Sequence, residues 1–437
     1  MNTAWPSKRL CSIADIRVSN VDKKTHASEK PVRLCNYLDV YTNDYVTNGL
    51  EFMEASASIT EIERFGLSVG DVIITKDSET PDDIGIPTVI TEPIDGLVCG
   101  YHLALIRPRA DQLDSVYLAK QLSTSRVARY FAAHATGSTR YGLPTSVIES
   151  VSIPTPPKPE QTKIADILST VDSAIRQTEA LTAKHQRVKT GLMQDLLTRG
   201  VDEHGNLRSE RTHLFKDSPL GRIPVEWELS RLESIGTWAS GGTPSKADAS
   251  YWGGEIPWMC PKDMKTFDLA ATIERLTPAG ARHGSKVMPA KTVFIVVRGM
   301  ILAHTFPVCI TSRPMSFNQD VKAIVANPSV EARFLAYWLA SQENYFLKIT
   351  TTATHGTKRF DTKELFDVMM AVPQREEQTR IVIRLDATEA QIDSDKKRVA
   401  KLRSIKTALM QDLLSGRKRV TALLEPEPKR EKMYANG

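Results

Sequence analysis

The chain has 437 residues, enough for two or three domains, and its 41% hydrophobic and 25% charged residues are typical of a globular protein. Its net charge of +5 permits nucleic-acid binding without identifying it. The five cysteines form no CxxC pair, and no stretch of 18 apolar residues occurs. These observations argue against a disulfide-rich secreted domain and a membrane span, and we expect a cytoplasmic protein with reduced thiols.

Residues 1–155 predict a first globular domain built from short strands and turns. The expected elements are a strand at 72–75, a strand at 97–106, a helix at 116–133, a polar Gly/Ser loop at 136–141 and a strand at 147–153. Four prolines between 154 and 159 then mark the entry to a long helix at 156–200.

The next stretch, 201–222, is polar and shows no hydrophobic period, so we interpret it as a linker. A second globular domain is expected at 223–372 and a second long helix at 373–420. We expect the tail at 421–437, which contains EPEPKREK, to be disordered.

This order of elements reflects a duplication of the whole chain. The segments 160–197 and 377–414 both begin with Glu-Gln-Thr and end with Leu-Met-Gln-Asp-Leu-Leu, and they align without a gap at an offset of 217. In the globular parts, Trp227 matches Trp5 at an offset of 222, and 356–360 (GTKRF) matches 137–141 (GSTRY) at an offset of 219. Two equal halves usually arrange about an approximate two-fold axis.

Apolar residues of both long helices recur with heptad spacing, which is typical of a coiled coil. The apolar seam of each helix must be buried against another element. We expect the other long helix to bury it, in an antiparallel pair that separates the two domains. The alternative is that each helix packs on its own domain. Polar residues interrupt the seam at Thr178, Thr182, His185 and Asp395. The predicted interface consists of Ile164, Leu168, Val171, Ile175, Leu192, Met193, Ile381, Leu385, Ile392, Val399, Leu402, Leu409 and Met410.

Motifs for catalysis and for cofactor binding are missing from the sequence. There is no phosphate-binding GxxxxGK[ST] loop, no GxSxG elbow and no HExxH. The nine histidines show no ligand spacing. We therefore expect no catalytic residues and no metal site.

The paired Gly loops are the best candidates for a binding site. Glycine allows close backbone approach, hydroxyls can donate to phosphates, and arginine can pair with guanine. Further basic candidates follow the apolar strands of both halves and lie in the turn 243–246. The predicted DNA-binding residues are Lys76, Gly137, Ser138, Thr139, Arg140, Tyr141, Thr243, Ser245, Lys246, Arg298, Gly356, Thr357, Lys358 and Arg359.

With these motifs in order, the chain resembles the specificity subunits of type I restriction–modification systems. The resemblance rests on PPKPEQ at 156–161, the two LMQDLL helix ends, KDSPLGRIP at 216–224, SGGTPS at 240–245 and YWGGEIP at 251–257. It covers nearly the whole chain, although VPQREEQ at 372–378 lacks the double proline of the first copy.

The resemblance implies an α+β protein with two tandem target-recognition domains, each reading one half of a split DNA sequence. The antiparallel coiled coil would set the gap between the halves. Two methyltransferase subunits would dock on the helices and use S-adenosylmethionine, and restriction subunits would use ATP and Mg²⁺. The chain itself would bind no cofactor and catalyse nothing.

Two other functions remain open from the residues alone. One is a coiled-coil adaptor whose two domains bind ligands other than DNA, and the other is an enzyme with an unrecognised active site. Salt-dependent binding to duplex DNA would separate the first from a DNA-binding protein. Activity of the isolated chain with S-adenosylmethionine would identify the second.

Overall fold

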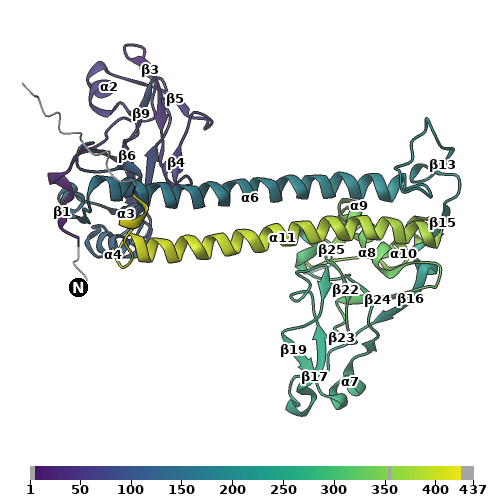
Figure 1. Ribbon diagram of the computed structural model, residues 1–437. Helices are drawn as coiled ribbons and strands as arrows, with labels where there is room; N and C mark the ends of the chain where they lie inside the picture. Colours follow the sequence, from purple (N-terminus) through teal and green to yellow (C-terminus); the bar gives the residue numbers. More distant parts are fainter. Residues whose placement is uncertain (1–4, 353–355, 425–437) are drawn as a thin grey trace, which may run out of the picture. The chain divides into compact units, whose positions relative to one another are not determined.

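The computed structural model describes residues 5–352 and 356–424. The chain divides into two compact units, one formed by Met1–Glu179 with Lys397–Gly437 and the other by Ala180–Lys396. Each unit holds one globular domain and one half of each of two long helices, α6 (Lys158–Thr198) and α11 (Arg375–Leu413), which are labelled in Figure 1.

The domain of the first unit mixes short strands with short helices. Its strands are β1 Ser7–Arg9, β2 Ala14–Val18, β3 Lys30–Cys35, β4 Tyr45–Val46, β5 Met53–Ala57, β6 Val72–Thr75, β7 Asp77–Ser78, β8 Pro87–Ile90, β9 Leu97–Cys99, β10 Leu103–Pro108, β11 Tyr141–Gly142 and β12 Ser152–Pro154. Its helices are α1 Tyr37–Tyr41, α2 Ile59–Phe65, α3 Ser115–Leu122, α4 Ser125–His134 and α5 Thr145–Ser150, with 3₁₀ turns at Leu10–Ser12 and Thr421–Leu423.

A five-stranded sheet in the order β2-β10-β6-β8-β4 forms the centre of this domain, and β5-β3-β9 forms a second, three-stranded sheet. Strands β6 and β8 are buried along their whole length, as β-branched runs such as Val-Ile-Ile-Thr favour. Helices α3 and α4 and the start of α6 pack on one face of the five-stranded sheet through Tyr117, Phe131 and Ile164.

The domain of the second unit has the same plan with additional strands. Its strands are β13 Phe215–Ser218, β14 Gly221–Pro224, β15 Glu228–Arg231, β16 Gly236–Ser240, β17 Trp252–Met259, β18 Asp268–Leu269, β19 Glu274–Leu276, β20 Val287–Met288, β21 Val293–Val296, β22 Val308–Thr311, β23 Met315–Phe317, β24 Val321–Ala326, β25 Thr351–Thr352, β26 Lys358–Arg359 and β27 Met369–Val372. Its helices are α7 Pro278–Gly284, α8 Ala332–Ser341, α9 Glu343–Lys348 and α10 Thr362–Asp367, with 3₁₀ turns at Leu232–Ile235, Ala249–Tyr251 and Met300–Ala303.

The duplication seen in the sequence is repeated strand by strand. The sheet β16-β24-β21-β22-β18 has the same internal order as β2-β10-β6-β8-β4, and β15-β27 repeats the small sheet β1-β12. The sheet β19-β17-β23-β20 repeats the order and strand directions of β5-β3-β9 and extends it by one strand, β20. The two domains therefore share a fold and both of its main sheets.

Within each unit, half of α6 lies beside half of α11 and the two run in opposite directions. In the first unit Asp172 pairs with Lys406 at 2.7 Å and Glu179 pairs with Arg403 at 2.6 Å. In the second unit Nδ1 of His185 lies 2.7 Å from Oδ2 of Asp395, and Lys189 pairs with Glu389. Residue numbers rise along one helix as they fall along the other, so the pair is antiparallel in each unit.

The seam residues fall into two groups. Ile164 and Leu168 lie in the core of the first domain, and Ile381 and Leu385 lie in the core of the second. Leu409 and Met410 pack against the first of these cores, and Leu192 and Met193 against the second. Of the remaining seam residues, Ile175 and Ile392 are buried and Val171, Val399 and Leu402 are half-buried. Packing on the domain and packing on the other helix thus both occur.

Near the start of each long helix, a buried glutamate accepts hydrogen bonds from the segment that follows the C-terminal end of the other helix. Glu160 accepts hydrogen bonds from Arg419 and from the backbone N–H of Val420. Glu377 accepts equivalent bonds from Arg208 and from the backbone N–H of Val201, together with the indole N–H of Trp227. A carboxylate at a helix N-terminus is also favoured by the helix dipole.

Several elements differ from the sequence-based predictions. The apolar run 97–106 is two strands, β9 and β10, which belong to different sheets because the chain turns at 100–102. The expected helix at 116–133 is interrupted after Leu122 and forms α3 and α4. The expected strand at 147–153 is wrong, since residues 145–150 form α5 and only 152–154 form a strand.

The predicted linker and tail contain more structure than expected. The hairpin β13–β14 lies within residues 215–224, and Val201 is fully buried. Residues 421–423 form a 3₁₀ turn after the buried Val420. Positions 425–437 of the predicted tail lie outside the described residues.

Candidate nucleic-acid interface

In the first domain the Gly loop closes on itself at the end of the central strand β6. The backbone groups of Thr136 and Gly142 exchange two hydrogen bonds of 3.0 and 2.8 Å, and β11 pairs with β7 directly after β6. Gly137 has φ = 138°, and a Cβ there would overlap the carbonyl oxygen of Arg140. Only glycine fits this position without strain. The loop therefore exposes Ser138, Thr139 and Arg140 on a rigid base.

Lys76 and Arg140 are brought together by a chain of polar contacts. Lys76 Nζ donates to Asp77 Oδ1 at 3.0 Å, and His102 Nδ1 lies 2.7 Å from Asp77 Oδ2. Nη2 of Arg140 lies 3.3 Å from Nε2 of His102. Burial alone would raise the pKa of Asp77, but the bonds from His102 and Lys76 outweigh it and lower that pKa. The predicted residues Lys76 and Arg140 thus belong to one cluster.

Aromatic residues that the sequence analysis did not select lie in the same region. Tyr37 and Tyr41 stack with ring centroids 5.5 Å apart, and the ring of Tyr101 lies 3.6 Å from that of His102. Burial and the nearby Asp83 raise the pKa of Tyr37, while Ser78 and Arg140 act in the opposite direction. These residues lie on α1, which is only one short helix, and on the turn between β9 and β10. Neither segment is long enough to show a hydrophobic period in the sequence.

In the second domain the predicted basic residues also meet at the end of a central strand. Arg298, just after β21, forms a β-bridge with Arg359, and the N–H of Gly299 donates to the carbonyl of Lys358 at 2.9 Å. Nε of Arg298 pairs with Oδ1 of Asp320 at 2.6 Å. The structure therefore brings Arg298 to the consecutive residues Lys358 and Arg359, which are distant from it in the sequence. Beside them Gly356 is exposed and Thr357 is half-buried.

The alignment of the two loops at an offset of 219 is wrong. The N–H of Leu143 donates to the carbonyl of Lys76, and the N–H of Phe360 donates to the carbonyl of Val297. Phe360 is thus the counterpart of Leu143 rather than of Tyr141, and the offset is 217, as in the long helices. The shared Gly-x-x-Arg pattern favoured the wrong alignment in the sequence. The correct correspondence is visible only in the backbone hydrogen bonds.

The turn at 243–246 contributes less than its sequence suggests. The ammonium of Lys246 lies 3.6 Å from the centroid of the Trp252 ring, also faces Trp258, and pairs with Glu274. The carbonyl of Ser245 accepts the indole N–H of Trp252. Only Thr243 lies close to the Arg298 cluster, because its hydroxyl donates to Gln319, the neighbour of Asp320. Lys246 is therefore occupied within its own domain.

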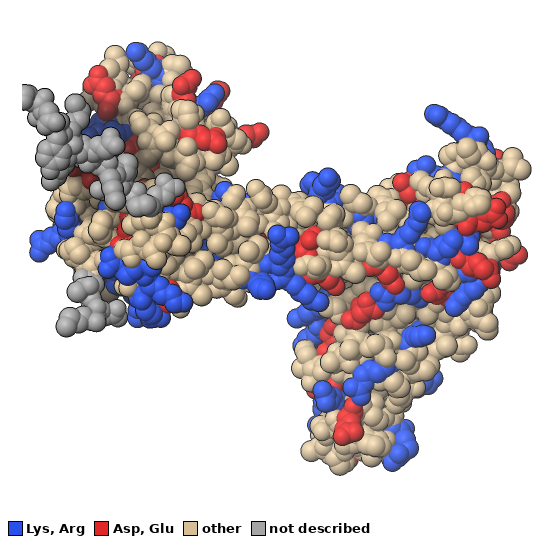
Figure 2. Space-filling model, in the orientation of Figure 1, with Lys and Arg blue, Asp and Glu red and all other residues tan. Residues whose placement is uncertain are grey.

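The charge of these surfaces is mixed. On the face shown in Figure 2, the second domain carries lysine and arginine side chains interspersed with acidic ones rather than in one continuous patch. In the first domain Asp77, Glu79, Asp82 and Asp83 lie within residues 76–83. Carboxylates weaken general phosphate binding but can accept from a cytosine amino group, so such surfaces suit selective contacts.

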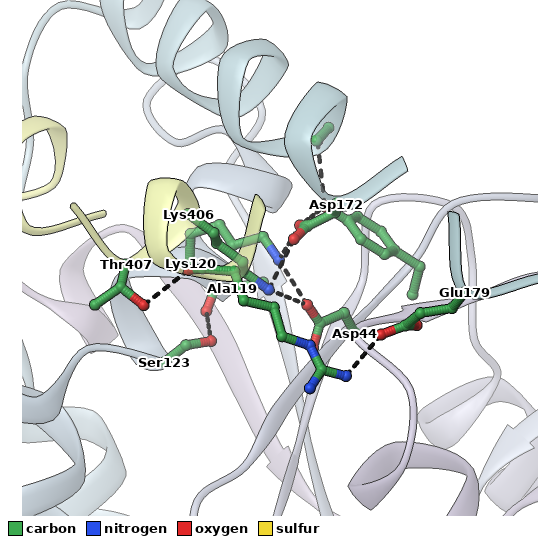
Figure 3. A network of polar contacts seen from close by, with 11 residues as sticks. Asp44, Ala119, Lys120, Ser123, Asp172, Glu179, Lys406 and Thr407 are labelled. Atoms are coloured by element: carbon green, nitrogen blue, oxygen red, sulfur yellow. Dashed lines mark hydrogen bonds and ion pairs between the residues drawn. The ribbon is translucent and has the colours of Figure 1, made fainter. Parts of the chain in front are cut away.

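The first domain is attached to the long helices by a buried ionic network that the sequence analysis missed (Figure 3). The Asp172 carboxylate of α6 lies 2.7 Å from Lys120 Nζ and 2.7 Å from Lys406 Nζ, and accepts from Tyr45 at 2.8 Å. The side chains of Asp172 and Lys120 are each 4% exposed. Asp44 binds the same two lysines. The network therefore joins the domain, α6 and α11 within the first unit.

The second unit makes an equivalent attachment with other residues. Asp386 of α11 accepts from Tyr337 at 2.7 Å and pairs with Arg333, which also pairs with Asp268. Tyr337 is the counterpart of Lys120 at the offset of 217. Each domain is thus fixed to its helix by an acidic side chain, but the charges are arranged differently.

The described residues, 5–352 and 356–424, show no grouping of three His, Cys, Asp or Glu side chains that could hold a metal ion. Over the same residues, no helix combines the length and apolar character needed to cross a bilayer. Cys35, Cys99 and Cys309 are buried, and burial raises the pKa of each thiol. Such thiols are poor nucleophiles.

Comparisons with known proteins agree with this architecture. A family profile described as "Type I restriction modification DNA specificity domain" matches residues 4–185 and again 224–404. The chain is 32% identical over 192 residues to the specificity subunit of the EcoR124I/EcoR124II type I restriction enzyme of Escherichia coli, covering 44% of this chain and 48% of that relative. It is 25% identical over 378 residues to a putative type I restriction enzyme MjaX specificity subunit of Methanocaldococcus jannaschii, covering 82% and 81%.

Solved structures show the same fold at lower sequence identity. The S subunit of a type I restriction–modification system from M. genitalium matches with a TM-score of 0.58 at 15% identity, covering 94% of this chain and 97% of the other. A chain from a structural study of complex assembly in the type I system matches with a TM-score of 0.55 at 18% identity, covering 95% and 98%.

Two copies of one DNA specificity domain, each leading into a long helix, define a two-domain protein of the DNA-recognition class. The chain belongs to the type I restriction–modification specificity family and has the two specificity domains of such a subunit. The alternative of an adaptor unrelated to DNA is not favoured.

Proposed function

We propose that this chain reads a bipartite DNA sequence, one half with each domain, and directs partner subunits to it. The main support is that each domain brings basic loop residues to the end of its central strand, and that these strands, β6 and β21, are equivalent. Arg140 lies beside the end of β6, and Arg298 with Arg359 lies beside the end of β21. The family membership makes duplex DNA the expected ligand of both surfaces.

The proposal assigns no reaction to the chain itself. Its sequence lacks the motifs for methyl transfer and for ATP hydrolysis. Methyltransferase subunits that carry S-adenosylmethionine would dock on α6 and α11, and restriction subunits would supply ATP- and Mg²⁺-dependent chemistry. The purified chain should therefore leave DNA unmethylated and uncut, and turnover by the chain alone would contradict this part of the proposal.

Two arginine variants test the reading of separate half-sites. Arg140→Ala should weaken binding of the assembled complex to one half-site and Arg359→Ala to the other, each by ~1–3 kcal/mol if the arginine contacts a base. Arg9→Ala, an exposed change on β1, is the control and should bind as the parent does. Binding is measured by titration of duplexes in which one half-site at a time is scrambled.

Salt dependence separates this function from protein or small-molecule binding. Phosphate contacts make log K fall linearly with log salt, with a slope close to the number of phosphates neutralised. A salt-independent affinity, or equal effects of both arginine variants on both half-sites, would contradict two-headed recognition.

A further inference from the structure

The cluster around His102 suggests a role that the architecture shared by the two domains does not assign. Arg140 is exposed, whereas the groups behind it are not, since the side chains of His102 and Asp77 are only 15% and 16% exposed. An exposed arginine on a loop loses several rotatable bonds of freedom when it binds. A fixed acceptor behind the guanidinium reduces that loss, because the side chain is already oriented.

The two partners of His102 suit one tautomer of the imidazole. With its proton on Nδ1, His102 donates to Oδ2 of Asp77, 2.7 Å away. The bare Nε2 can then accept from Nη2 of Arg140, 3.3 Å away. Lys76 Nζ holds the other oxygen of Asp77 at 3.0 Å, and the ring of Tyr101 covers the imidazole. Both sides of the carboxylate are thus engaged, and the imidazole is held in one orientation.

The backbone around the cluster is built to admit it. Gly142 lies opposite Asp77 in the β7–β11 pair, and a Cβ on Gly142 would lie 3.1 Å from Asp77 Oδ1. The N–H of Lys76 donates to the carbonyl of His102 at 2.9 Å, which fixes the turn between β9 and β10. The four side chains of the cluster come from three segments. Asp77 begins β7 and Lys76 directly precedes it, His102 lies in the turn between β9 and β10, and Arg140 lies in the Gly loop.

We propose that Asp77 and His102 are positioning residues for Arg140, which they orient for bidentate recognition of a guanine in the first domain's half-site. This inference rests on the proposed function and adds to it the residues that determine which base is read in the first half-site. The second domain uses a different solution, because Arg298 is held directly by Asp320 with no intervening histidine. The two half-sites should consequently respond to different substitutions.

The test measures methylation by the complete complex on duplexes carrying every base at each position of both half-sites. Arg140→Ala first identifies the base pair that Arg140 reads. His102→Phe keeps a ring against Tyr101 but removes the acceptor, and discrimination at that base pair should fall about tenfold or more, within the range of a bidentate contact. His102→Gln retains an acceptor and should restore most of the discrimination. Asp320→Asn is the matched variant in the other domain and should affect only the other half-site.

The outcomes separate this inference from the function on which it depends. If the parent complex shows no bipartite target, the proposed function fails. If the target is bipartite but His102→Phe discriminates like the parent, the positioning role is wrong. A uniform loss at every base pair with His102→Phe, or failure of His102→Gln to restore discrimination, would mean that His102 only supports the fold, and would also overturn the inference.

Discussion

Gly137 is the residue on which the shape of the first recognition loop depends most. Its φ of 138° and the overlap that a Cβ would make with the carbonyl of Arg140 leave no room for another residue. Strain of this kind costs about 1–3 kcal/mol where the backbone cannot relax. The loop lies on the surface, so the strain should distort the loop before it unfolds the domain.

Gly137→Ala should therefore weaken binding to the first half-site by about tenfold, with little change in thermal stability. Gly191→Ala is a matched control, because Gly191 lies in α6 with open space around it. Alanine there should stabilise the helix by ~0.5–1 kcal/mol and leave DNA binding unchanged. The measurements are half-site titrations and thermal melts of both variants. Parent-like binding by Gly137→Ala would show that the loop does not contact DNA.

At the scale of elements, the sequence predicted the long helices and the central strands but not the surfaces between them. Proline-bounded heptads and β-branched runs are local signals, and α6, α11, β6 and β21 follow them. The run 97–106 predicts one strand because LVC of β9 and LAL at the start of β10 are apolar throughout, and the structure buries all of these positions. Its break at 100–102 places His102, and that break depends on the N–H of Gly100 donating to Cys35, a contact distant in sequence.

For the candidate site, the sequence could predict only the basic residues of loops, not the side chains that they contact. Lys76 and Arg298 could be selected because they follow apolar strands, and Arg140 and Arg359 because they lie in polar Gly loops. Their partners Asp77, His102 and Asp320 are ordinary polar residues until the fold brings them together. The network around Asp172 was missed for the same reason, since a lone aspartate on a heptad helix resembles a solvated one.

The Asp172 network should be the main ionic attachment of the first domain to the helices. Asp172→Ala leaves the buried ammonium of Lys120 with Asp44 as its one carboxylate partner among the described residues, and breaking a buried pair costs ~3–5 kcal/mol. Hydrogen exchange of α3 and the middle of α6 should report this loss as faster local opening. Glu179→Ala removes an exposed pair with Arg403 and should cost less than ~1 kcal/mol. Equal protection in both variants would contradict the attachment.

The same network predicts a pH effect at the acid end. Burial alone would raise the pKa of Asp44, but Lys120 and Lys406 outweigh it and lower the pKa to about 2. Since the folded-state pKa is below the unfolded value of ~3.9, the contribution is present above that value and is lost as pH falls toward 2. Half of the Asp44 side chain is exposed, so the effect should be small. Asp44→Asn should flatten the pH dependence of α3 protection between pH 4 and 2, and an unchanged slope would contradict the assignment.

At the scale of the whole molecule, the proposed function gives different tasks to the two domains and to the two long helices. We expect the domains to determine the half-site sequences and the helix pair to determine the gap. In the middle of α6, at residues 176–179, Thr178 is buried and Glu179 pairs with Arg403. A single deletion there would disrupt packing as well as length.

Deletion of one heptad from each helix is the better test of the gap. Removing 180–186 together with 394–400 keeps the heptad register and takes out His185 and Asp395 as a pair. Seven residues are ~10 Å of helix rise, and a base pair is ~3.4 Å, so the gap should shorten by up to about three base pairs. The half-site sequences should stay the same. An unchanged gap in an active complex would mean that the helices do not set the spacing.

The central claim, that this chain carries the sequence specificity of a two-part DNA target, is tested most directly by the methylation pattern it produces. The chain is co-expressed with its methyltransferase partner in a host lacking other modification systems, and every methylated base is mapped by single-molecule sequencing. The account predicts one motif with two fixed blocks separated by a gap of unspecified bases, in which Arg140→Ala relaxes one block and Arg359→Ala the other. A single continuous motif, or a motif that stays the same when this chain is replaced by another specificity subunit, would contradict it.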